Sequence, residues 1–139
     1  MILKKDNCHD YVSEAYRYYA LCGCPDGERL RRMRLEASEF QRADFQDLEA
    51  VCRVIDRVRS EPDGSVTLRC MELVYFSQPR VSLTRGLITE RVLAASNELC
   101  VSESAVYRMM KRLRHMLAVE RGLRIEGSSS GVSLMSALN

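Results

Sequence analysis

Residues 89–117, TERVLAASNELCVSESAVYRMMKRLRHML, decide the fold that we expect for this chain. Before Cys100 the apolar residues recur at spacings of three and four, as on one face of a helix; they are Ile88, Val92, Ala95 and Leu99. After it, Ser102 can cap a second helix, and Glu103 favours the positive end of that helix. The stretch therefore predicts two helices joined by a turn of about three or four residues.

The second helix of this stretch has an apolar side and a basic side. Its apolar stripe comprises Val106, Met109, Met110, Leu113 and Leu117. Its opposite side carries Tyr107, Arg108, Lys111, Arg112 and Arg114. Residues 105–117 hold four Lys or Arg and no Asp or Glu, whereas the whole chain has a net charge of only +2. This local bias favours a nucleic acid as the partner, and the layout is that of a helix-turn-helix.

The run from Ala95 to Arg114, with an apolar helix expected before it at residues 66–76, resembles region 4 of bacterial sigma factors. It looks closest to the sigma-region-4-like regulators of phages and prophages of Gram-positive bacteria. The resemblance covers residues 66–117, and Cys100 stands where the motif usually has glycine. Because the residue there adopts a positive φ, a side chain costs ~1 kcal/mol. The resemblance implies promoter DNA binding, with contact to RNA polymerase as a further option.

The physical interpretation assigns roles along the recognition helix, expected at about residues 102–120. Residues near its N-terminus can reach base edges in the major groove, so the candidates for base readout are Glu103, Ser104, Tyr107 and Arg108. Candidates for phosphate contact are Ser102, Lys111, Arg112 and Arg114. Phosphate contacts add affinity and salt dependence without reading sequence.

The sequence predicts helices in the rest of the chain as well, because no alternating strand pattern persists for more than about four residues. We expect helices from about residue 7 to 21, from 27 to 42, from 45 to 59 and from 66 to 76, with caps at Asp6 or Asn7, Asp26, Asp44 and Ser65. Thr84 should cap the first helix of the helix-turn-helix, and Gly122 should end the second. Residues 123–125 can dock back as a short extended piece.

These expectations define an all-α protein, a helical bundle with a C-terminal helix-turn-helix. Residues 1–62 form an N-terminal helical region that acts as a scaffold or mediates self-association. Residues 63–126 form the sigma-region-4-like domain, and residues 127–139, GSSSGVSLMSALN, are expected to be a disordered tail. The second helix concentrates Arg29, Arg31, Arg32 and Arg34 in its first turns; a solvated face explains them best, and a second phosphate-contacting surface is the alternative.

Several classes of site find no support in the sequence. We find no catalytic constellation and no phosphate-binding glycine loop, so an enzyme and a bound cofactor are not expected. Four possible zinc ligands, Cys8, His9, Cys22 and Cys24, flank the first helix, but their spacing is poor for a structural zinc site. No run of about 18 apolar residues predicts a membrane span, and we expect a cytoplasmic protein.

The sequence therefore predicts a transcriptional regulator that binds double-stranded DNA sequence-specifically and needs no metal. Dimerisation on paired half-sites and monomeric action beside RNA polymerase both stay open. The rival hypothesis is an interaction module that uses the same helices to bind RNA polymerase or another regulator without touching DNA.

Overall fold

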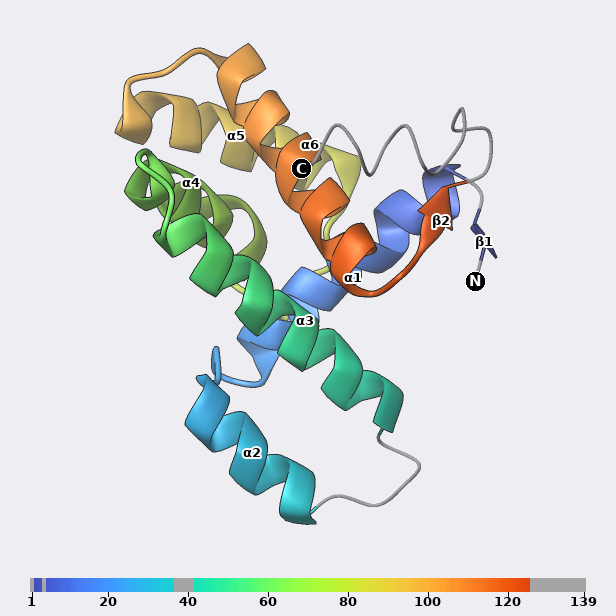
Figure 1. Cartoon of the computed structure of the whole chain (residues 1–139). Coiled ribbons are helices and arrows are strands. Elements are labelled where there is room, and N and C mark those ends of the chain that lie inside the picture. The colour runs from blue at the N-terminus through green and yellow to red at the C-terminus, as the bar shows by residue number, and fades with distance from the viewer. Residues whose placement is uncertain (1, 4, 37–41, 126–139) are drawn as a thin grey trace.

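The computed structural model describes residues 2–3, 5–36 and 42–125, and side chains from residue 10 to 36 and from 44 to 123. In this part of the chain the protein is all-α apart from one pair of two-residue strands (Figure 1). The N-terminal helices are α1 (Lys5–Leu21), α2 (Gly27–Glu36) and α3 (Arg42–Arg59). They are followed by α4 (Gly64–Met71), a π-helical segment η2 (Glu72–Phe76), α5 (Arg85–Leu99) and α6 (Glu103–Glu120).

The two strands bring the ends of the described chain together. β1 (Ile2–Leu3) pairs in parallel with β2 (Arg124–Ile125), which follows α6. Gly122 adopts φ +68° just after α6, where only glycine is free of strain, so the helix ends as the sequence predicts. The expected extended piece is confirmed at Arg124–Ile125.

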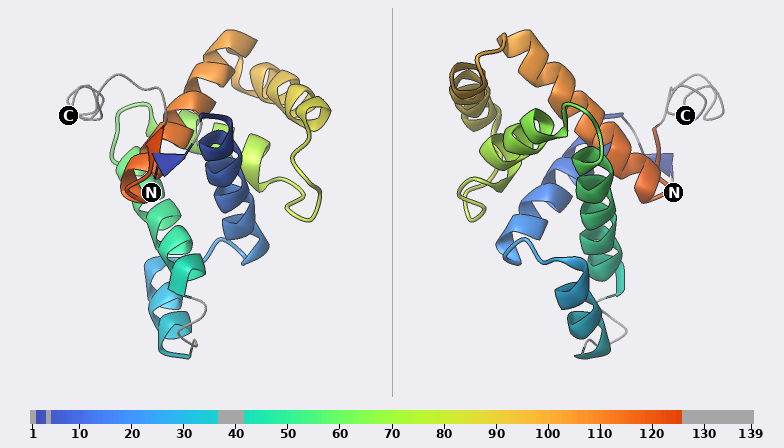
Figure 2. Two further views of the ribbon diagram at one scale, coloured as in Figure 1. Left: turned by 90° about the vertical axis from the view of Figure 1, so that its right-hand side faces the viewer. Right: turned by 60° about the vertical axis from the view of Figure 1, so that its left-hand side comes forward.

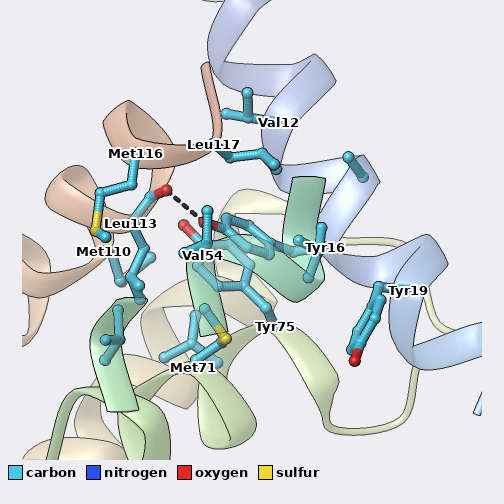
Figure 3. Packing of buried hydrophobic residues seen from close by; sticks show 14 of the residues in the cluster. Val12, Tyr16, Tyr19, Val54, Met71, Tyr75, Met110, Leu113, Met116 and Leu117 are labelled. Atoms are coloured by element: carbon cyan, nitrogen blue, oxygen red, sulfur yellow. Dashed lines mark hydrogen bonds between the residues drawn. The ribbon is translucent and has the colours of Figure 1, made fainter. Parts of the chain in front are cut away.

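One hydrophobic core joins the N-terminal helices to the C-terminal ones (Figure 3). At its centre Tyr16 of α1 stacks on Tyr75 of η2, with ring centroids 5.0 Å apart. The Tyr16 hydroxyl donates a hydrogen bond to the backbone carbonyl of Leu113 in α6. Around them α3 contributes Val54 and α4 contributes Met71, both fully buried. Residues from both sides of position 62 therefore pack into the same core and fix the position of α6.

Three of the predicted helix caps are confirmed. The Asp26 carboxylate accepts from the backbone N–H of Arg29 at 2.8 Å. The Thr84 hydroxyl accepts from Leu87 at 3.2 Å, and the Ser102 hydroxyl accepts from Ala105 at 3.1 Å. Each cap satisfies an N–H that the first turn of its helix leaves without an internal partner.

Three other caps were predicted wrongly. The helix α1 begins at Lys5, so Asp6 and Asn7 lie in its first turn and neither precedes it as a cap. The helix α3 begins at Arg42, so Asp44 lies in its first turn and is not its cap. The helix α4 begins at Gly64 with Asp63 before it, which places Ser65 inside the helix. Gly64 lies against the end of α3, where an added Cβ would be 2.0 Å from the carbonyl oxygen of Val58. This close approach of backbone requires glycine and starts α4 earlier than the capping pattern suggests.

The predicted helix over residues 66–76 changes its winding at Glu72, where the π-helical segment begins. Arg91 of α5 is only 7% exposed, and its Nη1 donates to the Val74 carbonyl at 2.7 Å. Carbonyls released from regular helical bonding can accept such side chains. Two expectations lie outside the described residues: the tail at 127–139 and the continuation of α2 beyond Glu36 up to the start of α3.

Candidate nucleic-acid interface

The pair α5–α6 lies at one end of the molecule, and the helix α2 lies at the other (Figures 1 and 2). The connection between α5 and α6 is three residues long, Cys100, Val101 and Ser102. Cys100 adopts φ 55° and ψ 43°, the left-handed conformation that glycine usually supplies in this turn. The positive φ expected at this position is therefore confirmed, and the side chain points into solvent.

Ser96 holds this turn against the end of α5. Its backbone carbonyl accepts from the N–H groups of Cys100 and Val101, the latter at 3.2 Å. Its hydroxyl donates to the Val101 carbonyl at 2.5 Å. These hydrogen bonds satisfy backbone groups at the C-terminal end of α5, and they fix the direction in which α6 leaves the turn.

One face of α6 is buried and the opposite face is in solvent. Six buried residues define the inner face: Val106, Met110, Leu113, Met116, Leu117 and Ala118. On the outer face, Ser104, Arg108 and Lys111 are exposed, and His115 continues the same stripe in a half-buried position. The spacings of four, three and four place these four side chains along one line of the helix.

All four residues predicted for base readout lie on the surface of the first two turns of α6. Glu103, Ser104 and Arg108 are exposed, and Tyr107 is 44% exposed despite its large ring. Within the part of the chain that the structure describes, no side-chain hydrogen bond or ion pair occupies Glu103 or Arg108. The structure thus brings these four side chains together with their polar groups turned to solvent.

The four residues predicted for phosphate contact differ in their exposure and in whether another side chain already binds them. Ser102 caps α6, and Lys111 is exposed without a partner among the described side chains. Arg112 forms a two-pronged ion pair with Glu61 of the α3–α4 turn, in which Nη1 lies 2.9 Å from Oε1. Arg114 is half-buried, and its Nη1 donates to the Tyr75 hydroxyl at 3.2 Å.

The pair of Glu61 and Arg112 changes the electrostatics of the outer face. The guanidinium lowers the pKa of the Glu61 carboxyl, chiefly by hydrogen bonding, and the carboxylate raises the pKa of Arg112 in return. Both groups therefore stay charged, and the carboxylate largely cancels the positive charge of Arg112. The uncompensated positive charge of the outer face falls on Arg108 and Lys111, and the exposed carboxylate of Glu103 lies at the start of the same helix.

Other arginines around α6 are paired as well. Arg69 of α4 contacts Glu98 of α5, with Nε 2.5 Å from Oε2. At the far end of α6, Glu120 is paired with Arg53 and Arg57 of α3 at 2.9 and 3.7 Å. These pairs link neighbouring helices, whereas Arg108 and Lys111 in the N-terminal half of α6 have no ion-pair partner among the described side chains.

Two further polar side chains of α5 and α6 lie outside the sets predicted from the sequence. Arg85 is exposed in the first turn of α5, where the positive helix end adds to its charge, and its place directly after the cap Thr84 is a signal that could have identified it. His115 lies on the outer stripe of α6. Burial, and then the charge of Lys111, lowers the pKa of His115, so its imidazole favours the neutral form.

The zinc alternative rests partly on Cys8 and His9, whose side chains lie outside the described residues. Among the described side chains no group of three or more His, Cys, Asp or Glu is arranged to hold a metal ion. Of the helices that the structure describes, none has the length and apolar character needed to cross a membrane.

Comparison with known proteins found no match for this chain among protein-family models, curated proteins or solved structures.

Proposed function

We propose that this protein is a transcriptional regulator that binds duplex DNA sequence-specifically through a helix-turn-helix made of α5 and α6. The observation that carries the proposal is the outer face of α6. In its first three turns, Ser104, Arg108 and Lys111 lie on one solvent-facing stripe, and Glu103 and Tyr107 are exposed beside it, next to an exposed helix N-terminus. This is what a recognition helix must present to the major groove.

The chemistry of each side chain fits a defined partner on DNA. Arg108 can donate two hydrogen bonds to a guanine, and Glu103 can accept from a cytosine amino group. The Ser102 hydroxyl occupies the N–H of Ala105, which leaves the N–H groups of Glu103 and Ser104 at the start of α6 for a phosphate oxygen. Lys111 lies about two turns further along and would contact phosphate.

The helix α5 would cross the DNA backbone, as the first helix of such a motif does. The exposed Arg85 and the positive end of α5 would then contribute a phosphate contact. The sequence resemblance to sigma factor region 4 supports the same orientation, and it adds RNA polymerase as a proposed partner. The same proposal includes a cytoplasmic location and kinship with the sigma-region-4-like regulators of phages and prophages.

A second candidate function is protein interaction without DNA contact. Leu93 of α5 is 52% exposed next to the exposed Ala94, and a protein partner could cover this apolar pair.

The decisive experiment is selection of bound sequences from a random pool of duplex DNA, followed by anisotropy titrations with the selected site and a scrambled one. The proposal expects a conserved motif and an affinity for the selected site that exceeds the affinity for the scrambled site by about 10³ or more. Equal binding to both sites, or none to either, would leave protein interaction as the function.

A further inference from the structure

A groove between α1 and the first turns of α3 leaves an apolar stripe of α1 partly uncovered. Its volume is about 570 Å³. Its apolar lining consists of Tyr11, Ala15, Tyr18 and Leu21. Because these residues recur at spacings of four and three, they lie along one face of α1. The two tyrosines are half-buried and Leu21 is 43% exposed, so the described residues do not complete the packing on this face.

Internal contacts neutralise most of the charge at the edges of the groove. Asp47 accepts from Arg121 at 2.5 Å, and Glu14 is paired with Arg17 at 2.9 Å. The other carboxylates of the lining are Asp10, which has an interaction of its own, and the exposed Asp44. A charged occupant would lose hydration here and find few free partners, so the groove suits an apolar, uncharged segment.

Residues 127–139, GSSSGVSLMSALN, have this composition. They contain no Asp, Glu, Lys or Arg, and the first five are glycine and serine, as in a flexible linker. In a helix over 132–138, Leu134, Met135 and Leu138 would share one face, and two serines would lie opposite. A helix this short is unstable by itself and forms only when an apolar surface packs against it.

This segment begins close to the groove. The strand β2 ends four residues after Arg121, whose guanidinium contacts Tyr11 in the lining of the groove. β2 also contacts α1 and lies beside the N-terminal half of that helix (Figure 2). From Tyr11 to Leu21 the groove follows α1 for about 15 Å. Residues 126–131 can span about 20 Å when extended, so they can carry the apolar part to either end of the groove.

We propose that residues 132–138 dock as a short helix into the α1–α3 groove of their own chain, with Leu134 and Leu138 packed on Tyr18 and Leu21. The same chain is the fitting occupant, because a short linker that starts beside the groove gives the segment a high effective concentration there. The docked segment completes the packing on α1. It does not involve α5 or the outer face of α6, so the inference is independent of DNA binding.

The test is hydrogen exchange of the full chain, measured as protection of the amides of residues 132–138. Leu134→Glu and Leu21→Glu should each lower this protection about tenfold or more, because each puts a charge into an apolar contact. The matched controls are Ser136→Glu, on the opposite side of the same helix, and Leu93→Glu, a leucine of α5 that is 52% exposed. Both controls should keep the protection of the wild type.

Nuclear Overhauser effects identify the contact itself. We expect them between the methyl groups of Leu134 and Leu138 and the ring of Tyr18, and a mixture of differently labelled copies tests whether they arise within one chain. Circular dichroism verifies folding, and Leu21→Ser replaces Leu21→Glu if that variant unfolds.

Three results would overturn the proposal. The first is a wild type without protection at residues 132–138, and the second is protection that survives both Leu134→Glu and Leu21→Glu. The third is a set of contacts that arise only between two copies, which would place the segment in the groove of a second copy. None of these results bears on DNA binding, which anisotropy measures separately.

Discussion

Cys100 is the residue at which the chain departs from the usual chemistry of its turn. Its left-handed conformation is disfavoured for any residue with a Cβ, and its side chain contributes little packing because it is exposed. The hydrogen bonds of Ser96 hold the turn in place against this strain. The backbone geometry of the turn is thus imposed by its neighbours.

Replacing Cys100 with glycine should therefore stabilise the protein. We expect Cys100→Gly to raise the free energy of unfolding by about 0.5–1 kcal/mol, since the relief of strain exceeds the added entropy of the unfolded chain. Urea denaturation followed by circular dichroism measures it. Cys100→Ala keeps the Cβ and should leave stability nearly unchanged. A loss of stability in the glycine variant would show that the turn is unstrained.

In the proposed DNA complex, Glu61 would limit what Arg112 can contribute to binding. The two-pronged pair between them must open before Arg112 can reach a phosphate. We expect Glu61→Gln to tighten binding to specific and random DNA alike, and to steepen the salt dependence by about 0.9 in log K against log salt for the one phosphate gained. Anisotropy titrations at several salt concentrations measure both effects.

The matched control for Glu61 is Glu120→Gln, which frees Arg53 and Arg57 at the opposite end of α6. It should leave DNA affinity and the salt slope as they are. If both variants tighten binding equally, net charge explains the effect. If Glu61→Gln weakens binding, the pair supports the interface instead of competing with it.

At the scale of the element, the proposed function divides the outer stripe of α6 between base readout and phosphate contact. In that proposal Arg108 would reach base edges, whereas Lys111, further from the helix start, would contact phosphate. Arg108→Ala should cost about 1–3 kcal/mol on the selected site and much less on random DNA. Lys111→Ala should weaken all sequences by a similar factor and reduce the salt slope by about 0.9.

The control for both substitutions is Arg32→Ala, an exposed arginine on α2 at the other end of the molecule. It should change neither affinity nor selectivity. Losses from Arg108→Ala and Lys111→Ala that are the same on selected and random DNA would contradict the division of roles along the helix.

At the scale of the whole molecule, the core makes α6 depend on the N-terminal helices. Tyr16 of α1 stacks on Tyr75 and donates to the carbonyl of Leu113 in α6, so three elements meet at one side chain. Burial raises the pKa of Tyr16 well above its usual value, and the hydroxyl stays protonated as a donor. The helices on both sides of position 62 should therefore unfold together.

Tyr16→Phe tests this coupling. It removes one buried hydrogen bond while keeping the ring, and we expect a loss of about 1 kcal/mol in the free energy of unfolding. Unfolding should stay a single transition by far-ultraviolet circular dichroism and tyrosine fluorescence, with affinity for DNA unchanged in the folded protein. Two separate transitions would show that the N-terminal helices and α4–α6 are independent units.

Local sequence rules predicted the parts of this structure that depend on near neighbours. The caps at Asp26, Thr84 and Ser102 each serve an N–H three residues ahead, and the periodicity of residues 103–120 defines which face of α6 is buried. The same rules misplaced the starts of α1, α3 and α4. At α4 the reason is a contact between Gly64 and Val58, which no local pattern reveals.

By itself the sequence determined the helical class, the turn at Cys100 and the four side chains of α6 that lie together on its outer face. Only the tertiary structure decided which cations are free, because Arg112 meets Glu61 across 51 residues of chain and Arg114 meets Tyr75 across 39. Helix periodicity indicates on which side of a helix a residue lies. It carries no information on which side chain from a distant part of the chain packs against that residue. Such a contact decides whether a charged group faces solvent or an internal partner.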